Sequence, residues 1–288
     1  MHTDELEAAT QPTTTTTLSE LGFELPVGTE PATGADVRGR AFAFKSWRAS
    51  DERVVGAMRD KDRSMTQGSY VAAVLAHFLT EWGHHDFASM DAKSRRLVLN
   101  QSFAADVFAA WMQLRREVLG DECTIDVACT ACRAQFGYDV QLGTVEVRTL
   151  PDGTRTASPF SLRDGFEWRG ELRKAGILRP VRWAVYESLG KGGGSINVGE
   201  MKLALLASAV SGLAGVEGAL HLPSAALDLT KYDLETLTLQ VDETQPGPDL
   251  SIEDKCPECG IDFRRTMPWT YDAFFSVRSS SRGAPRGE

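Results

Sequence analysis

The sequence predicts an α+β fold in which mainly helical lobes surround one discontinuous four-cysteine zinc ribbon. Four of the five cysteines lie in two C-x₂-C turns: Cys129, Cys132, Cys256 and Cys259. Each turn adjoins a segment in which apolar and polar residues alternate, as they do in a strand. Elsewhere apolar residues recur at helical spacing, most clearly from Ser102 to Leu119.

The cysteine spacing favours a metal site over the alternatives. A single C-x₂-C turn could be a redox pair, but no βαβ pattern surrounds either turn. Four thiolates are the complete ligand set of a closed tetrahedral Zn²⁺ site, which leaves no open position for catalysis. We therefore predict one structural Zn²⁺, bound by Cys129, Cys132, Cys256 and Cys259. Cys123 stands six residues before the first pair and is expected to be a small buried residue.

The two halves of this site are far apart in the chain. Between Cys132 and Cys256 lie 123 residues. If both halves bind one ion, the metal closes a long excursion of the chain, and this is where a cross-link is expected to stabilise most.

Composition and periodicity divide the chain into six segments. Residues 1–34 are acidic, then threonine-rich, then Pro/Gly-rich, which is typical of a flexible arm. Within them, Leu18, Leu21, Phe23 and Leu25 are expected to dock on the protein's own core, with a partner as the alternative. The other segments are a strand and helical lobe (35–122), the first half of the ribbon (123–150), a helical insertion (151–249), the second half of the ribbon (250–276) and a flexible tail (277–288).

The individual elements follow from the apolar period and from turn residues. One strand is expected over 37–47. Helices are expected from Ser50 and over 70–82, 102–119, 160–189, 201–213 and 228–241. Gly120 ends the third of these helices, and the glycines of 190–195 form a linker.

Charge and the two ends of the sequence limit the classes of partner. The formal charge of −9 and the pI near 5.2 argue against nucleic acid and anionic membranes as partners. The first residues lack the basic and apolar regions of a signal peptide, and charged residues interrupt the apolar run 201–219. We expect a cytoplasmic protein, with incorporation into a virion or injection particle as the alternative.

No catalytic constellation is visible in the sequence. The patterns G-x-S-x-G, H-E-x-x-H and G-x-G-x-x-G are absent. Gly190-Lys191 does not complete a phosphate-binding loop, because Val185 and Gly192 stand where that loop needs glycine and a hydroxyl residue. His84 and His85 have no nucleophile to serve and are expected to be exposed at a helix end. We therefore expect a protein that is not an enzyme.

The order of these features resembles the baseplate proteins of T-even-type contractile phages and their relatives in phage-tail-like contractile injection systems. The likeness lies in the segment 38–44 rich in Arg and Phe, in the cysteine pair before the acidic strand 138–142, and in the close 256–263 followed by Phe274-Phe275. The resemblance implies a non-enzymatic hub or assembly role, either as a chaperone or as a permanent subunit, with other baseplate or tail proteins as partners.

Two other classes of function remain as alternatives. A zinc ribbon that binds nucleic acid, as in transcription-associated proteins, is permitted by Lys255, Arg264 and Arg265, although the acidic total charge argues against it. A metal-dependent hydrolase would need an open ligand position, which four thiolates do not leave.

Overall fold

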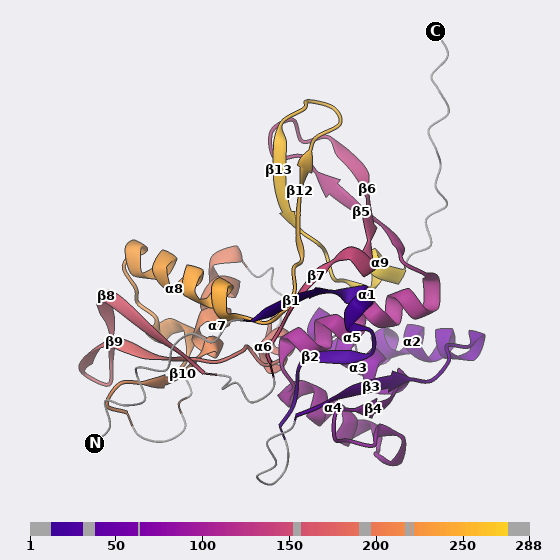
Figure 1. Ribbon diagram of the computed structural model, residues 1–288, viewed down its shortest axis with the longest axis horizontal. Helices are drawn as coiled ribbons and strands as arrows, with labels where there is room; N and C mark the ends of the chain where they lie inside the picture. Colours follow the sequence, from indigo (N-terminus) through magenta and orange to yellow (C-terminus); the bar gives the residue numbers. More distant parts are fainter. Residues whose placement is uncertain are drawn as a thin grey trace.

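The computed structural model describes residues 13–30, 38–62, 64–151, 157–189, 197–216, 220 and 222–275. Helices account for 42% and strands for 32% of the structure, which confirms the α+β class. Figure 1 shows three parts: a body, a side lobe that carries β8, β9, β10, α7 and α8, and an arm of two hairpins that projects from the body. Among the described helices, none has the length and apolarity needed to cross a membrane.

The core of the body is built around two buried helices. In α3 (Gln67–Phe78), ten of twelve residues are buried, and α5 (Ala104–Leu119) is buried continuously from Ala104 to Arg115. Such helices need apolar neighbours on nearly every side. These neighbours come from the other helices of the body: α2 (Ala49–Lys61), α4 (Ala92–Gln101), α6 (Ala184–Ser188) and α9 (Tyr271–Phe275), with the 3₁₀ turn η2 (Phe87–Ser89).

Two small antiparallel sheets complete the body. One has the order β2–β3–β4 and the other β1–β7–β11. Their strands are β1 (Thr14–Thr17), β2 (Glu24–Thr29), β3 (Gly39–Phe44), β4 (Leu79–Trp82), β7 (Glu146–Thr149) and β11 (Gly247–Pro248). The second sheet joins segments from the start, middle and end of the chain, because β7 is its central strand.

The expected flexible arm is wrong for residues 13–30. The threonine run forms β1, whose residues pair with β7, and α1 (Leu18–Leu21) follows behind the N-cap Thr17. Leu18 and Leu25 are fully buried and Leu21 is half-buried against the core, as expected, whereas Phe23 is 41% exposed. Threonine favours strands, and a composition-based reading could not see that β7 supplies the partner strand. Residues 1–12 and 31–34 lie outside the described residues.

The helix expected over 160–189 is also wrong. This segment forms the hairpin β8 (Ser158–Trp168) and β9 (Glu171–Leu178), followed by the short helix α6. Arg169 and Gly170 join the two strands, both with positive φ (54° and 80°), as a two-residue hairpin turn requires. The insertion 151–249 is therefore mixed rather than helical: β10 (Val210–Leu213), β9 and β8 form the sheet of the side lobe, whereas α6 and β11 belong to the body.

An irregularity in β8, stabilised by a buried carboxylate, hides the strand pattern in the sequence. At Arg163–Gly165 the register of β8 shifts, so its alternation of apolar residues is broken. Asp233, fully buried in α8 (Lys231–Thr244), accepts hydrogen bonds there from three successive backbone amides: Arg163 (2.9 Å), Asp164 (2.9 Å) and Gly165 (2.7 Å). The bulge is thus satisfied by a side chain from a distant helix.

Two other helices are shorter than expected at their C-terminal ends, because a strand follows directly. The helix expected over 70–82 ends at Phe78 and continues as β4, and the helix expected over 201–213 is α7 (Val198–Ala209) followed by β10. The helices from Ser50 and over 102–119 and the strand over 37–47 are confirmed in type as α2, α5 and β3. The linker 190–195 and the tail 277–288 lie outside the described residues.

Candidate metal centre

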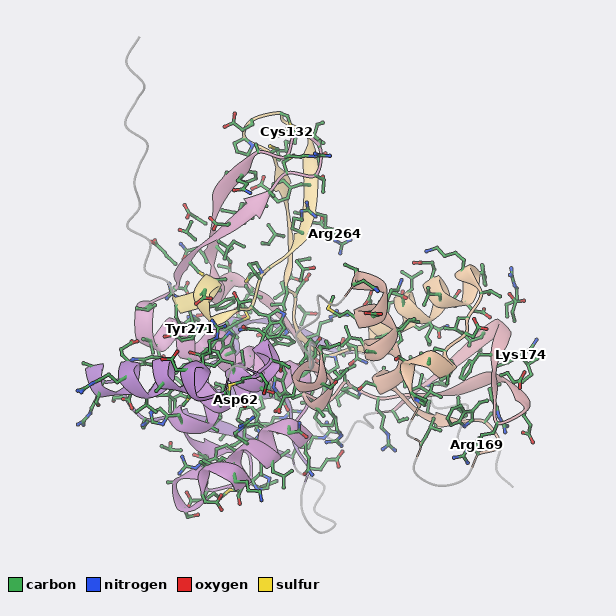
Figure 2. All side chains as sticks on the ribbon, turned by 180° about the vertical axis from the view of Figure 1, so that it is seen from behind. Asp62, Cys132, Arg169, Lys174, Arg264 and Tyr271 are labelled. Atoms are coloured by element: carbon green, nitrogen blue, oxygen red, sulfur yellow. The ribbon has the colours of Figure 1, made fainter. Side chains whose placement is uncertain are left out.

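The arm that carries the four ribbon cysteines consists of two antiparallel hairpins. In the first, β5 (Glu122–Ala128) pairs with β6 (Gln135–Gln141), and in the second, β12 (Ser251–Lys255) pairs with β13 (Asp262–Thr266). The hairpins lie side by side in both views, with Cys132 at the tip of the arm and Tyr271 at its base (Figure 2). Segments that are more than a hundred residues apart in sequence therefore reach one place together.

The first hairpin ends in a cysteine knuckle that its own backbone holds. The Cys129 N–H donates to the Ala134 carbonyl (2.9 Å), and the Arg133 N–H donates to the Cys129 carbonyl (3.1 Å). The Ala131 N–H points at the Cys129 sulfur, 3.4 Å away. These bonds close a tight turn around the first sulfur, and such amide dipoles favour a thiolate over a thiol.

The second knuckle repeats this pattern position for position. The Cys256 N–H donates to the Ile261 carbonyl (3.0 Å), and the Gly260 N–H donates to the Cys256 carbonyl (2.8 Å). In each turn, the fourth residue after the first cysteine has a left-handed backbone, with φ 71° at Gly260 and 62° at Arg133. Glycine adopts this conformation without steric cost, whereas arginine does not.

The knuckles bring the four predicted cysteines into one cluster. Their sulfur atoms all lie within 4.8 Å of one another. Across the two hairpins, the Cys129 and Cys259 sulfurs are 3.8 Å apart, and those of Cys132 and Cys256 are 3.7 Å apart. Disulfide sulfurs would be about 2.0 Å apart, so the cluster is a set of free donors arranged around a common centre.

The electrostatics of the cluster call for a cation. Backbone N–H groups of Cys132 and Ala131 lower the pKa of Cys129 to about 6. The pKa of Cys132 is instead raised to about 12: the Ala134 amide lowers it, but desolvation and the three neighbouring sulfurs outweigh that effect. Once one thiolate has formed, further negative charge on adjacent sulfurs is unfavourable unless a metal ion compensates it. The cluster is therefore a set of four cysteines that could hold a metal ion, without a fifth protein donor among the described residues.

Side-chain contacts between the two hairpins, on the side of the cluster nearer the body, stabilise their relative position. Phe263 of β13 packs edge-on against Phe136 and Tyr138 of β6, with ring centroids 5.6 and 6.2 Å apart. The Arg265 guanidinium donates to the Ala128 carbonyl from Nε (3.2 Å) and a terminal nitrogen (3.1 Å). These contacts hold the hairpins in register, so the sulfurs meet when both hairpins are folded.

The base of the arm is fixed to the body by α9. The Trp111 indole N–H donates to the Trp269 carbonyl (3.0 Å), and buried Arg115 donates to the Phe274 carbonyl. Tyr271 and Phe275 are stacked, with ring centroids 5.1 Å apart. The closing aromatic residues noted in the sequence thus anchor the segment that leaves the second hairpin.

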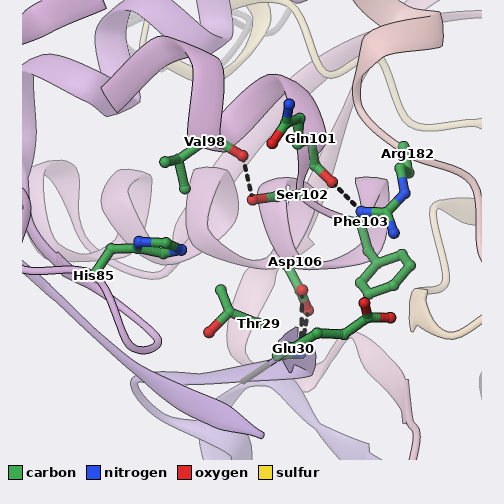
Figure 3. A pocket seen from close by; sticks show the side chains of 10 residues that line it. Thr29, Glu30, His85, Val98, Gln101, Ser102, Phe103, Asp106 and Arg182 are labelled. Carbon is green, nitrogen blue, oxygen red and sulfur yellow. Dashed lines mark hydrogen bonds between the residues drawn. The ribbon is translucent and has the colours of Figure 1, made fainter. Parts of the chain in front are cut away.

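The body contains a pocket that no sequence pattern predicted. It has a volume of about 180 Å³ and lies between β2 and the junction of α4 and α5 (Figure 3). His85 lines it, from the turn after β4 rather than from the expected helix end. Asp106 lies at its floor, 1% exposed, and accepts hydrogen bonds from the Val27 N–H (2.7 Å) and the Gly28 N–H (3.1 Å). No sequence pattern marks such a residue, because Asp106 stands within an amphipathic helix.

Asp106 should give the protein a pH-dependent stability. Burial raises the pKa of Asp106 from its usual value near 4 to about 7, although the Val27 and Gly28 amides oppose the shift. Because the folded state binds the proton more tightly, this contribution is complete below pH 4 and is lost as the pH rises to 7. From pH 5 to pH 8 the loss should be on the order of 2 kcal/mol.

Urea unfolding at both pH values measures this contribution. Asp106→Asn should remove most of the difference. Asp91→Asn should preserve it, because Ser94 holds the pKa of the exposed Asp91 below its usual value. A parent protein that is equally stable at pH 5 and pH 8 would contradict the expectation.

Gly260→Ala should weaken metal binding without creating a steric clash. A Cβ at Gly260 meets no atom within 4 Å, so the cost is the left-handed backbone alone, about 1–2 kcal/mol or five- to thirtyfold in affinity. Gly56→Ala is the matched control, since its Cβ also meets nothing within 4 Å but lies in α2. It should raise the unfolding free energy by up to about 1 kcal/mol and leave metal affinity unchanged. Competition with a chromophoric chelator measures both, and equal affinities of the two variants would refute the backbone argument.

Comparisons with known proteins identified no relative of this chain. No family model matches the chain, and no curated protein or solved structure is significantly similar to it. The four cysteines that could hold a metal ion lie at the end of a projecting arm.

Proposed function

We propose that the metal is Zn²⁺ and that its role is structural. Zn²⁺ bound by thiolates at about 2.3 Å in a tetrahedron separates the sulfurs by about 3.8 Å, which agrees with the 3.7 and 3.8 Å of the two cross-hairpin pairs. Soft sulfur donors in this number suit zinc better than calcium or magnesium. Four protein ligands also fill the coordination sphere, so the ion holds the arm together and offers no position for substrate.

We further propose that the chain is a non-enzymatic assembly protein of a contractile phage tail or a related injection system. The observation that carries this proposal is the placement of a closed metal site on a projecting arm, which suits contact with other proteins better than chemistry. The resemblance of the sequence to contractile-tail baseplate proteins supports the same role. The partners would be other baseplate or tail proteins. The chain would either be a permanent subunit of the baseplate or act as a chaperone during its assembly.

The charge of the arm disfavours nucleic acid as the partner. Within residues 122–141 and 251–266, seven Asp and Glu stand against four Lys and Arg. Arg264 is also paired with Glu253 (2.9 Å). Four thiolates around a divalent ion add further negative charge. Counterion release is the dominant source of non-specific affinity for DNA, and it would therefore contribute little to binding by this arm.

Purified protein should contain one zinc per chain, and Cys259→Ser should lose it. Loss of the ion should cost several kcal/mol, because folding and metal binding are coupled at structural zinc sites. Hydrogen exchange should place the change in β12 and β13, since α9 still anchors the base. Cys123→Ala is the control, because Cys123 is buried in β5 outside the sulfur cluster. A zinc-free parent, two ions per chain or an unchanged melting temperature in Cys259→Ser would each contradict the proposal.

Deletion of the gene should abolish functional contractile particles and leave cell growth unchanged. Electron microscopy should show tails that are missing or lack a baseplate. The parent gene and Cys123→Ala should restore particles, and Cys259→Ser should not. Normal, fully contractile particles in the deletion strain would refute the assembly role. Sub-micromolar binding of duplex DNA that weakens steeply with salt would instead favour the nucleic-acid alternative.

A further inference from the structure

A groove separates the two hairpins of the arm at the end nearer the body. It has a volume of about 430 Å³ and is walled by residues 138–141 of β6 and 251–253 of β12. Its apolar lining consists of buried or half-buried side chains: Tyr138, Val140, Val145, Ile252 and Met267. Above it, Phe263 closes the space between the hairpins through its contact with Tyr138. The groove is thus a short slot lined by both polar and apolar residues, and its two walls are strands.

The wall formed by β6 has a free backbone edge. In the described part of the chain, β6 pairs only with β5. The bonds from Leu142 N–H to Asp121 C=O and from Cys129 N–H to Ala134 C=O set the phase of this ladder. In an antiparallel pair, alternate residues turn their N–H and C=O groups outward. By this phase Asp139 and Gln141 point theirs away from β5, and both residues line the groove. The Gln141 carbonyl already accepts from the Thr144 hydroxyl (2.8 Å), so Asp139 offers the backbone groups for pairing on this wall.

The wall formed by β12 has the same property. Among the described strands, β12 pairs only with β13. The bonds from Met267 N–H to Leu250 C=O and from Cys256 N–H to Ile261 C=O set its phase. Glu253 therefore turns its backbone N–H and C=O outward, and Glu253 lines the groove. Two unpaired strand edges thus flank one slot.

The charged residues that line the groove are all acidic. They are Asp139, Glu146, Asp249 and Glu253, and no lysine or arginine lines it. Of these, only Glu253 forms an ion pair with a described residue, the exposed Arg264. Asp249 accepts from the Ser251 N–H (2.8 Å) and Asp139 from the Thr124 hydroxyl, both uncharged donors. The rim therefore carries negative charge that the described part of the chain leaves largely uncompensated.

We propose that the groove binds a short, extended and basic segment of a partner protein by strand addition between β6 and β12. Outward backbone groups would pair with the added strand, and its alternate side chains would enter the slot beside its apolar residues. Lysine or arginine at the intervening positions would meet the carboxylates of the rim. The proposal deepens the assembly role by giving the chemistry of the partner, and the biological meaning of the contact depends on that role.

The acidic rim also selects among occupants. A nucleic acid would bring its phosphates against four carboxylates, so it is repelled. Exposed edges invite strands of any chain, and carboxylates at the edge discourage uncharged or acidic ones. A second copy of this chain is the remaining competitor, and the experiment separates it by dependence on protein concentration.

The test uses full-length, metal-loaded protein and a labelled peptide of alternating lysine and valine, seven residues long. Binding followed by fluorescence anisotropy should weaken as salt is added. The same peptide with glutamate in place of lysine should not bind. N-methylation of the valines, which removes half of the backbone donors, should abolish binding. Amide hydrogen exchange should show Asp139 and Glu253 protected only when the lysine peptide is present.

Matched variants locate the site on the arm. Glu146→Gln with Glu253→Gln should weaken peptide binding about fivefold, as expected for two exposed ion pairs. Glu122→Gln with Asp262→Asn removes the same charge from the two strands outside the groove, and should change affinity less than twofold. All four side chains are exposed, so none of the changes should unfold the protein.

Several results would overturn the proposal. Equal binding of the glutamate peptide, equal loss in the two double variants, or unprotected Asp139 and Glu253 amides would each refute strand addition. Protection that appears without peptide and grows with protein concentration would assign the groove to a second copy. A normal particle in the gene deletion would refute the assembly role but leave the peptide result intact, so the two failures are distinguishable.

Discussion

Closure of the chain between its two cysteine hairpins is the constraint on which the arm depends. Each hairpin has only two strands, and an isolated two-stranded hairpin is at best marginally stable in water. The arm adds only a few buried side chains to this, among them Val127, Ile252 and Phe263. A metal ion shared by both hairpins can offset the entropy of bringing residues 129 and 256 together. On the proposed role, the metal ion would stabilise a projection whose own core is small.

The two hairpins are joined at both ends of the arm, by a different kind of interaction at each end. At the tip it consists of four sulfurs within 4.8 Å, and at the base of aromatic packing and hydrogen bonds to buried α5. Arg115 links the elements at the base, since its guanidinium donates to the carbonyls of Gly120 (2.8 Å), Glu122 (2.8 Å) and Phe274. The start of the first hairpin and the end of the second are thus tied to one side chain. Because the base is fixed independently, the orientation of the arm depends on the body, whereas the proposed metal ion would act on the tip.

The parts of the structure that could be predicted are those that local chemistry determines. The ligand set followed from two C-x₂-C turns, and α5 followed from an apolar stripe that Gly120 ends. The hairpin β8–β9 could not be read, because its alternation breaks at a bulge that Asp233 satisfies from 68 to 70 residues away. The strand β1 could not be read either, since its partner β7 lies 135 residues along the chain. Nor could the groove, which exists only where β6 and β12 face each other.

Two buried aspartates show how the body and the side lobe hold irregular strands without regular pairing. Asp106 and Asp233 each occupy the third position of a helix, where the helix dipole favours a carboxylate. Asp106 accepts the amides of Val27 and Gly28, and Asp233 those of three residues in β8. In both cases a helix start takes the place of a neighbouring strand as acceptor for buried amides. The two strands of the arm groove, β6 and β12, differ in this respect. Their outward groups at Asp139 and Glu253, both exposed residues, face a slot rather than a helix start, and the proposed partner strand would pair with them there.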